Sequence, residues 1–402
     1  MTFITIIISL IIIGLIAHIS GNLIEKIKIP SLMGMMIAGM IIGPYVLNIV
    51  PSVTLSLAPF IKDIALVTVL FIAGLGISKA QMQKIGRPAV LLSVIPATLE
   101  GFAIALLSMV FLDFTFIQGA ILGFIIAAVS PAVLIPSMLA LIDQRLGENK
   151  SIPQMLLVGA SADDTVAITL FTSFLAIYTV QANGGNASFI NQMMMIPITI
   201  VVSIAVAYVV AKGLSFILPK LKFGIVLVFG ICLIMRLLES NLHLSYFNSL
   251  LTVMMVGFFL RYFINDMALQ IQQIMNQVWK YGKLYLFIFV GMAINPMLVK
   301  DYFFVGFGML AISLTVRSCG VWLSLLGTDL NLYERLFCVV AYLPKATVQS
   351  AKAGIPLQMG VAGGEVMQAL AILSVLITAP IGAIGIRLTA PKWLEQAENN
   401  QS

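Results

Sequence analysis

Two adjacent carboxylates lie at the centre of a long hydrophobic stretch of this chain. Asp163 and Asp164 occur near the middle of the apolar run 154–180. One ionised side chain at the centre of a membrane-spanning helix costs about 2.5–3.5 kcal/mol on insertion scales, so helix packing does not explain a pair of them. Neighbouring residues on a helix point about 100° apart, which lets one aspartate line a cavity while the other faces a neighbouring helix.

The aspartate pair is suited to holding a proton or a small cation. Two interacting carboxylates titrate as a coupled unit. A carboxylate that titrates near neutral pH can hold either a proton or a hard cation such as Na⁺, and this competition is sufficient for cation/proton exchange. Hard cations prefer oxygen ligands, which hydroxyl groups can supply. The candidate hydroxyl ligands are those of Ser130, Ser161, Thr165 and Thr347.

A lysine lies in a second apolar run. Lys345 follows Pro344 within the run 333–353. A buried ammonium group needs a carboxylate, and Asp163 or Asp164 is the expected partner. Such a lysine releases its proton readily, which can accompany Na⁺ binding to the partner aspartate. The alternative is that Lys345 extends to the membrane interface, because Pro344 shortens the helix there.

Two further charges of opposite sign stand alone in apolar runs. Glu100 lies in the run 88–111 and Arg317 in the run 302–326. We expect them either to form a static salt bridge that holds two parts of the protein together, or to take part directly in proton transfer.

Prolines interrupt two of the apolar runs. Pro131 and Pro136 break the run 115–141, and Pro344 breaks the run 333–353. Each proline removes a backbone donor and leaves a carbonyl unpaired. Unwound backbone is tolerated at membrane depth only where protein or a water-filled cavity satisfies it. The ends of the interrupted helices also carry partial charges. We therefore expect both breaks to lie beside the aspartates.

The whole chain has the composition of an all-α polytopic membrane protein. Of its 402 residues, 60% are hydrophobic and 9% are charged, whereas soluble domains are about 45–50% apolar and about 25% charged. At about 20 residues a span, we expect about 13 membrane-spanning helices. The expected spans are 2–19, 31–47, 60–78, 88–111, 115–141, 154–180, 190–217, 223–239, 246–262, 283–299, 302–326, 333–353 and 364–388.

Basic residues predict the orientation of these spans. If the N-terminus lies outside, most of the 22 lysines and arginines fall in cytoplasmic loops, and the C-terminus is cytoplasmic. The expected location is the plasma or inner membrane. The basic residues do not cluster on a soluble face, so the net charge of +6 does not indicate nucleic-acid binding.

Three features recur at the same offset of an odd number of spans. They are a glycine-containing segment, a single buried charge and a proline break. An odd offset reverses orientation in the membrane, so we predict two inverted repeats of six spans each, joined by the seventh span as a linker. Interrupted helices at matching repeat positions are typical of transporter binding sites.

Four motifs carry a resemblance to a known superfamily. They are Met36–Pro44, Ser130–Met138, Ser161–Asp164 and Leu343–Gln349. On these motifs the chain resembles the monovalent cation/proton antiporters, in the two-aspartate branch that includes bacterial sodium/proton antiporters and mammalian sodium/hydrogen exchanger-like proteins. The resemblance implies crossed discontinuous helices in a core domain and a separate domain that forms a homodimer.

The resemblance also implies a role for each buried charge. Asp164 would be the main carrier of Na⁺ and of the proton, Asp163 would pair with Lys345, and Glu100 and Arg317 would form a second pair. Many relatives have Asn-Asp in place of Asp163-Asp164, which goes with electroneutral exchange. The aspartate pair therefore favours electrogenic exchange, with the stoichiometry left open.

These expectations divide the chain into regions. The core, ion-translocating domain is expected at 60–180 and 283–388, and the dimerisation domain at 1–59 and 190–262. The polar stretch 264–281 is expected to form an interfacial helix that links two halves.

The expected function is secondary active exchange of Na⁺, or Li⁺, for H⁺ by alternating access. The protein would be a transporter that serves pH homeostasis and not an enzyme.

K⁺/H⁺ exchange is an alternative because ligand distances set ion choice. A Na⁺-coupled organic anion transporter on the same scaffold is another. An intramembrane aspartyl protease would need its two aspartates on two helices. The expected partners are monovalent cations, protons, the lipid bilayer and a second copy of the chain, with no cofactor and no nucleic acid.

Overall fold

The computed structural model of the chain describes residues 2–26, 31–182, 195–221, 224–242, 247–297, 300–346, 349 and 352–397. The regular elements in these ranges are helices, apart from one antiparallel β-bridge, which confirms the all-α class. Eight helical segments of the described residues are long and apolar enough to cross a membrane, and one of them, Phe116–Asp143, contains a break. The count of about 13 spans stays a prediction. Thr347, a predicted ligand, lies outside the described residues.

The chain divides into two compact units. One comprises Met1–Lys79 and Ile200–Met297, and the other comprises Ala80–Thr199 and Leu298–Ser402. These boundaries differ from the predicted ones, because the run at 60–78 belongs to the first unit rather than with the core. The roles of the two units in dimerisation and ion translocation stay predictions.

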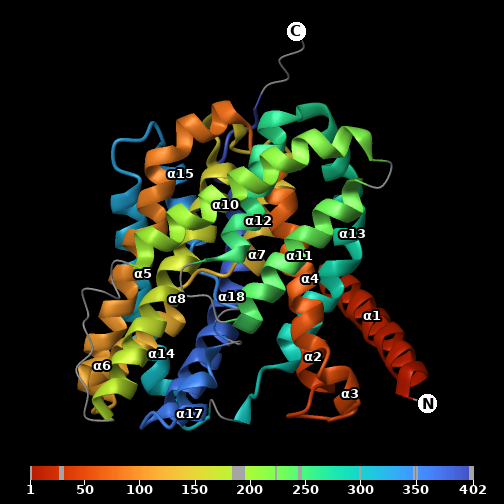
Figure 1. Cartoon of the computed structure of the whole chain (residues 1–402). Helices are drawn as coiled ribbons and strands as arrows, with labels where there is room; N and C mark the ends of the chain where they lie inside the picture. The colour runs from red at the N-terminus through yellow and green to blue at the C-terminus, as the bar shows by residue number, and fades with distance from the viewer. Residues whose placement is uncertain are drawn as a thin grey trace. The chain divides into compact units, whose positions relative to one another are not determined.

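Close helix packing builds the first unit. Its elements are α1 (Thr2–Lys26), α2 (Ser31–Ile42), α3 (Ser52–Leu55), α4 (Ala58–Leu75), most of α10 (Met195–Ile217), the short η2 (Leu218–Lys220), α11 (Gly224–Leu242), α12 (Ser249–Phe263) and α13 (Asn265–Met292). In Figure 1, α1 and α2 (red) pack against each other, and both contact α13.

Glycine explains why α4 lies in the first unit. A Cβ atom at Gly74 of α4 would overlap the carbonyl oxygen of Met254 in α12. Gly257 of α12 in turn packs against the backbone of Phe71. Because neither glycine has a side chain, the two helix backbones touch directly, and this contact ties α4 to α12.

The predicted linker helix is wrong as a separate element. Residues 265–281 form the first part of α13, which continues without interruption to Met292. The buried residues of this first part are Ala268, Ile271, Met275 and Trp279. They recur every three or four positions, so one apolar stripe packs along the helix while the polar residues occupy the opposite face. The polar composition therefore marked a helix face and not a boundary.

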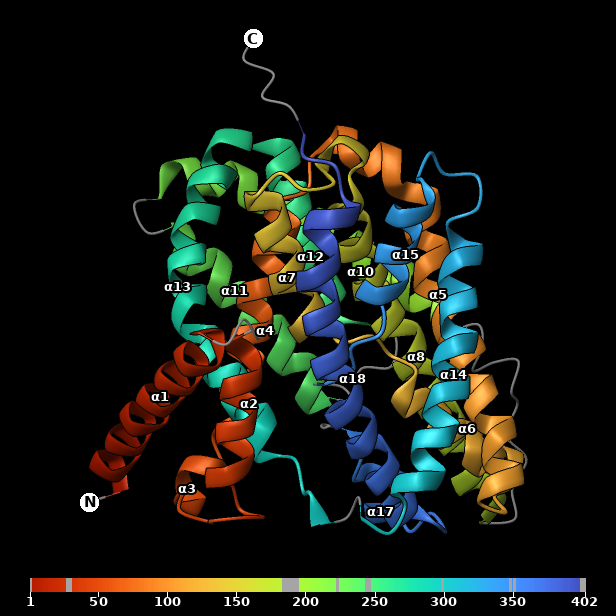
Figure 2. The same cartoon turned by 180° about the vertical axis from the view of Figure 1, so that it is seen from behind.

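Two interrupted helices give the second unit its form. Its elements are α5 (Lys79–Phe111), α6 (Phe116–Ile126), α7 (Pro131–Asp143), the short η1 (Glu148–Lys150), α8 (Ile152–Ala182), α14 (Phe303–Ser324), α15 (Leu332–Ala341), α17 (Ile355–Gln358) and α18 (Gly364–Trp393). The long α18, blue in Figure 2, packs against α14 and α15. α8 packs against both α6 and α7.

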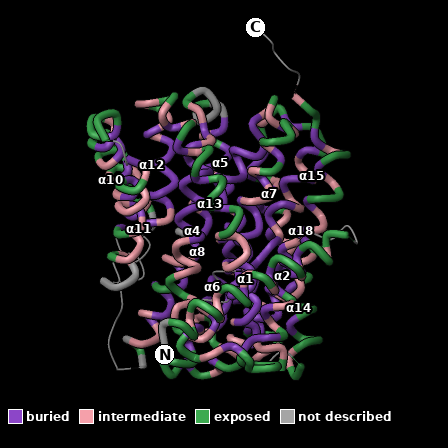
Figure 3. The backbone as a smooth tube through the Cα atoms, turned by 90° about the vertical axis from the view of Figure 1, so that its right-hand side faces the viewer, coloured by how far each residue is buried: buried purple, intermediate pink, exposed green. Residues whose placement is uncertain are grey.

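The chain is unwound at two of the three predicted prolines. α6 ends at Ile126 and α7 begins at Pro131, and non-helical backbone around Pro344 follows the end of α15. Pro136 is not a break, because α7 runs through it. A proline inside a helix removes one hydrogen bond, and α7 continues on the bonds of its neighbours. Residues 119–135 are all buried. Figure 3 draws buried backbone in purple.

Candidate functional site

The break between α6 and α7 leaves backbone groups without helical partners. Pro131 can start α7 because the first helical position needs no N–H donor. Ser130, at the N-cap, has an extended backbone with φ −82° and ψ 110°. The carbonyls at the end of α6 therefore need partners from elsewhere, and other parts of the second unit supply them.

The two breaks touch each other. The N–H of Ser130 donates to the carbonyl oxygen of Pro344 at 2.8 Å. The N–H of Lys345 donates to Oγ1 of Thr378 on α18 at 2.9 Å. One backbone hydrogen bond therefore joins the two breaks, and the crossing of two discontinuous helices stays a prediction.

Glu100 is the common partner of both buried cations. Its Oε2 atom lies 2.8 Å from Nη1 of Arg317 and 2.6 Å from Nζ of Lys345. All three side chains are completely buried. The predicted Glu100–Arg317 pair is therefore present. The alternative in which Lys345 extends to the membrane interface is excluded.

The predicted pair of Lys345 with Asp163 is wrong. Asp163 Oδ2 instead lies 3.3 Å from Nη2 of Arg317, and it accepts a hydrogen bond from the N–H of Val129 at 2.8 Å. The planar guanidinium has donors that point in different directions, so Arg317 can contact two carboxylates at once. Lys345 has a single charged nitrogen, and this nitrogen forms its ion pair with Glu100.

Arg317 also binds backbone at both breaks. It donates through Nη1 to the carbonyl of Ala127 and through Nε to the carbonyl of Tyr342, the latter at 2.7 Å. Its guanidinium lies over the ring of Tyr342, 5.5 Å from the centroid. Lys345 Nζ reaches the same Ala127 carbonyl at 3.1 Å. Two cations thus meet the C-terminal end of α6, where the helix dipole is negative.

Asp164 and the predicted serine ligands are buried in the same unit. Asp164, on α8, is 2% exposed. Ser161 donates its hydroxyl to the carbonyl of Leu157 in its own helix at 3.0 Å, and its oxygen can still accept. Ser130 is fully buried at the α6–α7 break. Their roles as ligands stay predictions.

Sequence reasoning did not assign a role to Gln349. Its Nε2 donates to the carbonyls of Ile126 at 3.2 Å and of Ala128 at 2.7 Å, and its Oε1 accepts from the N–H of Ala346 at 2.9 Å. The side chain is fully buried. A polar amide in an apolar run, just after the buried Lys345, was the signal that marked it.

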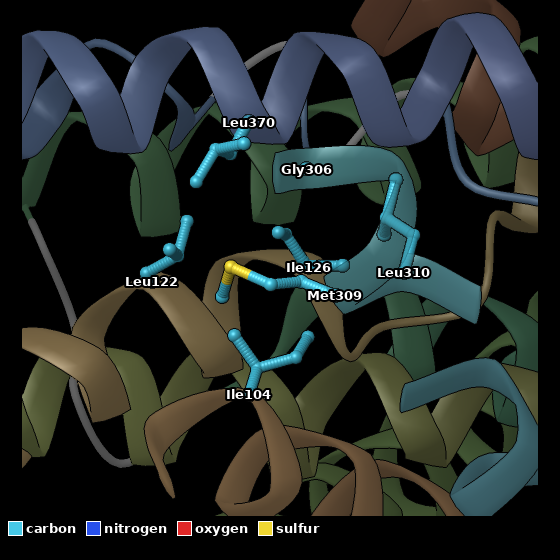
Figure 4. Close-up of a pocket in the computed structure, with 7 residues that line it drawn as sticks. All are labelled: Ile104, Leu122, Ile126, Gly306, Met309, Leu310 and Leu370. Carbon is cyan, nitrogen blue, oxygen red and sulfur yellow. The ribbon is translucent and has the colours of Figure 1, made fainter. Parts of the chain in front are cut away.

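An apolar crevice also lies in the second unit (Figure 4). Its lining includes Ile104, Leu122, Met309 and Leu370, from four different helices, and contains no polar side chain. Because the lining side chains offer no oxygen ligand, this crevice does not serve as an ion site.

A family model described as sodium/hydrogen exchanger, transmembrane, matches residues 3–391. The chain belongs to the sodium/hydrogen exchanger family. The exchanger is 30% identical to sodium/hydrogen exchanger 9B2 of Xenopus tropicalis, over 95% of this chain and 74% of that protein. It is 28% identical to sodium/hydrogen exchanger 9B1 of Homo sapiens, over 94% of this chain and 76% of that protein.

The fold of the exchanger is similar to a solved structure. That structure is the sodium proton antiporter MjNhaP1 from Methanocaldococcus jannaschii, with a TM-score of 0.77 at 20% identity, covering 98% of this chain and 99% of that one. These findings confirm the superfamily read from the motifs. The exchanger is accordingly a multi-pass membrane protein that exchanges cations for protons.

The charge balance at the two breaks has the form that such exchange needs. Ion pairs join the side chains of Glu100, Asp163, Arg317 and Lys345, and the next residue on α8, Asp164, is also buried. If all five side chains are ionised, the carboxylates outnumber the cations by one, and a net charge in a buried cluster is costly. One proton or one monovalent cation on the aspartate pair restores neutrality.

Proposed function

We propose that this protein exchanges Na⁺, or Li⁺, for H⁺, with cation and proton competing for the buried aspartate pair and Asp164 as the main carrier. The observation that carries the proposal is that the ion-paired cluster of Glu100, Asp163, Arg317 and Lys345 is followed on α8 by one further buried carboxylate, Asp164. A proton and a monovalent cation neutralise that carboxylate equally well, so occupancy by one displaces the other.

The two aspartates have different surroundings, which supports different roles. Asp163 is held by Arg317 and by the N–H of Val129, so its charge is compensated by fixed groups. Asp164 lies one position further along α8 and points about 100° away. Asp163 Oδ1 and Ser130 Oγ are buried and have no hydrogen-bond partner within the described residues. These oxygens suit the coordination of a hard cation beside Asp164.

Because Lys345 pairs with Glu100 and not with Asp163, the role proposed for Lys345 changes. Because its ammonium lies on Glu100, it is not a counterion that leaves an aspartate when Na⁺ binds. Lys345, Glu100 and Arg317 instead form a fixed charged frame that holds both breaks. The unit that contains this frame would expose Asp164 to each side of the membrane in turn, and the other unit would form the scaffold of a homodimer.

The proposal also includes the location of the protein and the orientation of its termini in the membrane. The protein would reside in the plasma or inner membrane with its N-terminus outside and its C-terminus in the cytoplasm. This orientation rests on the distribution of basic residues between the loops.

Proton flux in proteoliposomes tests the function. Vesicles with an acidic interior and an entrapped pH-sensitive dye receive NaCl, LiCl, KCl or choline chloride, with protein-free vesicles as control. We expect NaCl and LiCl to alkalinise the interior and KCl and choline chloride to have no effect. A response to KCl with none to NaCl would establish K⁺/H⁺ exchange instead, and equal responses would show exchange that does not distinguish the two cations. Na⁺ uptake that depends on an added organic anion, without proton flux, would contradict antiport.

A further inference from the structure

One peptide group at the α6–α7 break is held from both sides. The peptide between Ala128 and Val129 is planar, so its carbonyl and its N–H point in opposite directions and rotate together. The carbonyl of Ala128 accepts from Nε2 of Gln349 at 2.7 Å. The N–H of Val129 donates to Oδ2 of Asp163 at 2.8 Å. Any rotation of this peptide weakens both hydrogen bonds at once.

Gln349 is itself fixed by further contacts. Its Nε2 also reaches the carbonyl of Ile126 at 3.2 Å, and its Oε1 accepts from the N–H of Ala346 at 2.9 Å. One neutral amide therefore connects the backbone of both breaks. A primary amide supplies two donors and an acceptor from one planar group, which suits it to this position.

We propose that Gln349 is a positioning residue for Asp163: through the Ala128–Val129 peptide it aims a backbone N–H at the carboxylate and so sets the competition between proton and cation. The inference rests on the proposed function and goes beyond it, since Gln349 touches neither aspartate. A hydrogen bond donated to a carboxylate favours its charged form. Without Gln349 the peptide is free to rotate, and the charged form of Asp163 loses that support.

Several charged groups surround Asp163 and stay in place in this proposal. Arg317 on α14 contacts it directly, and Lys345 beyond α15 and Glu100 on α5 belong to the same ion-pair cluster. Asp164 follows it on α8, and Tyr342 lies beneath the Arg317 guanidinium. Loss of the Val129 N–H therefore changes the support of the Asp163 carboxylate while these charges stay in place.

The test uses the full-length protein in proteoliposomes and two substitutions. Gln349→Met removes both donors and the acceptor while keeping the side-chain length. Gln349→Glu is isosteric, keeps an acceptor, and can donate one hydrogen bond only when protonated. Gln154→Leu is the matched control, since Gln154 is a fully buried glutamine of α8 whose Nε2 donates to Oε1 of Glu148 at 3.5 Å. The KM for Na⁺ and the pH profile of proton flux are measured for each.

We expect Gln349→Met to raise the KM for Na⁺ about five- to tenfold on the acid side of the profile, because the lost support is a fraction of a charged hydrogen bond. The pH profile should move to higher pH, the maximal rate should change little, and Gln349→Glu should lie between Gln349→Met and the wild type. Gln154→Leu should match the wild type in its KM for Na⁺, its pH profile and its maximal rate.

Other results would overturn the inference while leaving the proposed function intact. One is a Gln349→Met protein with wild-type KM and pH profile. Another is a variant whose maximal rate falls while KM and profile stay fixed, which would indicate a purely structural residue. Failure of both Gln349 variants to fold would also overturn it, because the amide would then serve the fold and not Asp163. Failure of the proposed function would show differently, as a wild-type protein with no cation-driven proton flux.

Discussion

Replacing Asp164 by asparagine should abolish cation-driven proton exchange, with a loss of about 100-fold or more, as for removal of a group that itself carries the proton. The substitution keeps the size of the side chain but removes the acid–base group and the excess negative charge of the cluster. No proton can then be carried at this position, and no charge draws a cation to it. The measurement is Na⁺-driven proton flux in proteoliposomes.

Two controls distinguish lost chemistry from lost structure. Asp143→Asn makes the same change at an exposed position on α7 and should leave the flux at the wild-type level. Asp164→Glu keeps a carboxylate and should retain measurable exchange with a raised KM for Na⁺. Wild-type flux in Asp164→Asn would show that Asp164 does not carry the proton or the cation.

Replacing Arg317 by methionine should strongly destabilise the fold, by about 3–5 kcal/mol, the range for removing one partner of a buried ion pair. Arg317 is fully buried and donates to Glu100, to Asp163 and to the carbonyls of Ala127 and Tyr342. Methionine fills similar space but leaves those acceptors with fewer donors at low dielectric. The measurement is the melting temperature of the purified protein in detergent, which should fall sharply.

The destabilisation should be specific to the buried frame. Arg387→Met, at an exposed position on α18, is the matched control and should melt with the wild type. Adding Asp163→Asn to Arg317→Met should recover part of the loss, because the second change removes the charge of the carboxylate whose ion pair the first change removed, while Glu100 keeps its pair with Lys345. A wild-type melting temperature in Arg317→Met, or strict additivity of the pair, would contradict this account of the frame.

Much of the site was predictable because the membrane penalises charge. An ionised side chain in an apolar run has few explanations, so Glu100, Asp163 and Arg317 stood out without knowledge of the fold. Proline chemistry likewise identified the breaks at Pro131 and Pro344, where backbone donors are missing. Both kinds of signal are local, and each depends on one residue and its neighbours.

The partners of these groups were not predictable in the same way. Depth along a helix does not say which carboxylate Lys345 meets, and the structure pairs it with Glu100 rather than Asp163. The contribution of Gln349 depends on carbonyls that only the break in α6 exposes. The placement of α4 in the first unit depends on a backbone contact at Gly74. Each of these outcomes is set by three-dimensional contacts between distant segments.

The central claim is that proton and cation compete for one buried carboxylate pair, and the dependence of the KM for Na⁺ on pH tests it most directly. Wild-type flux is measured at saturating and sub-saturating Na⁺ across about pH 6 to 9, a range that spans neutral titration. The account predicts that, on the acid side, the KM rises about tenfold for each unit of falling pH while the maximal rate stays constant. A KM that does not change with pH, together with a maximal rate that falls, would place the proton and the cation on separate sites and contradict the account.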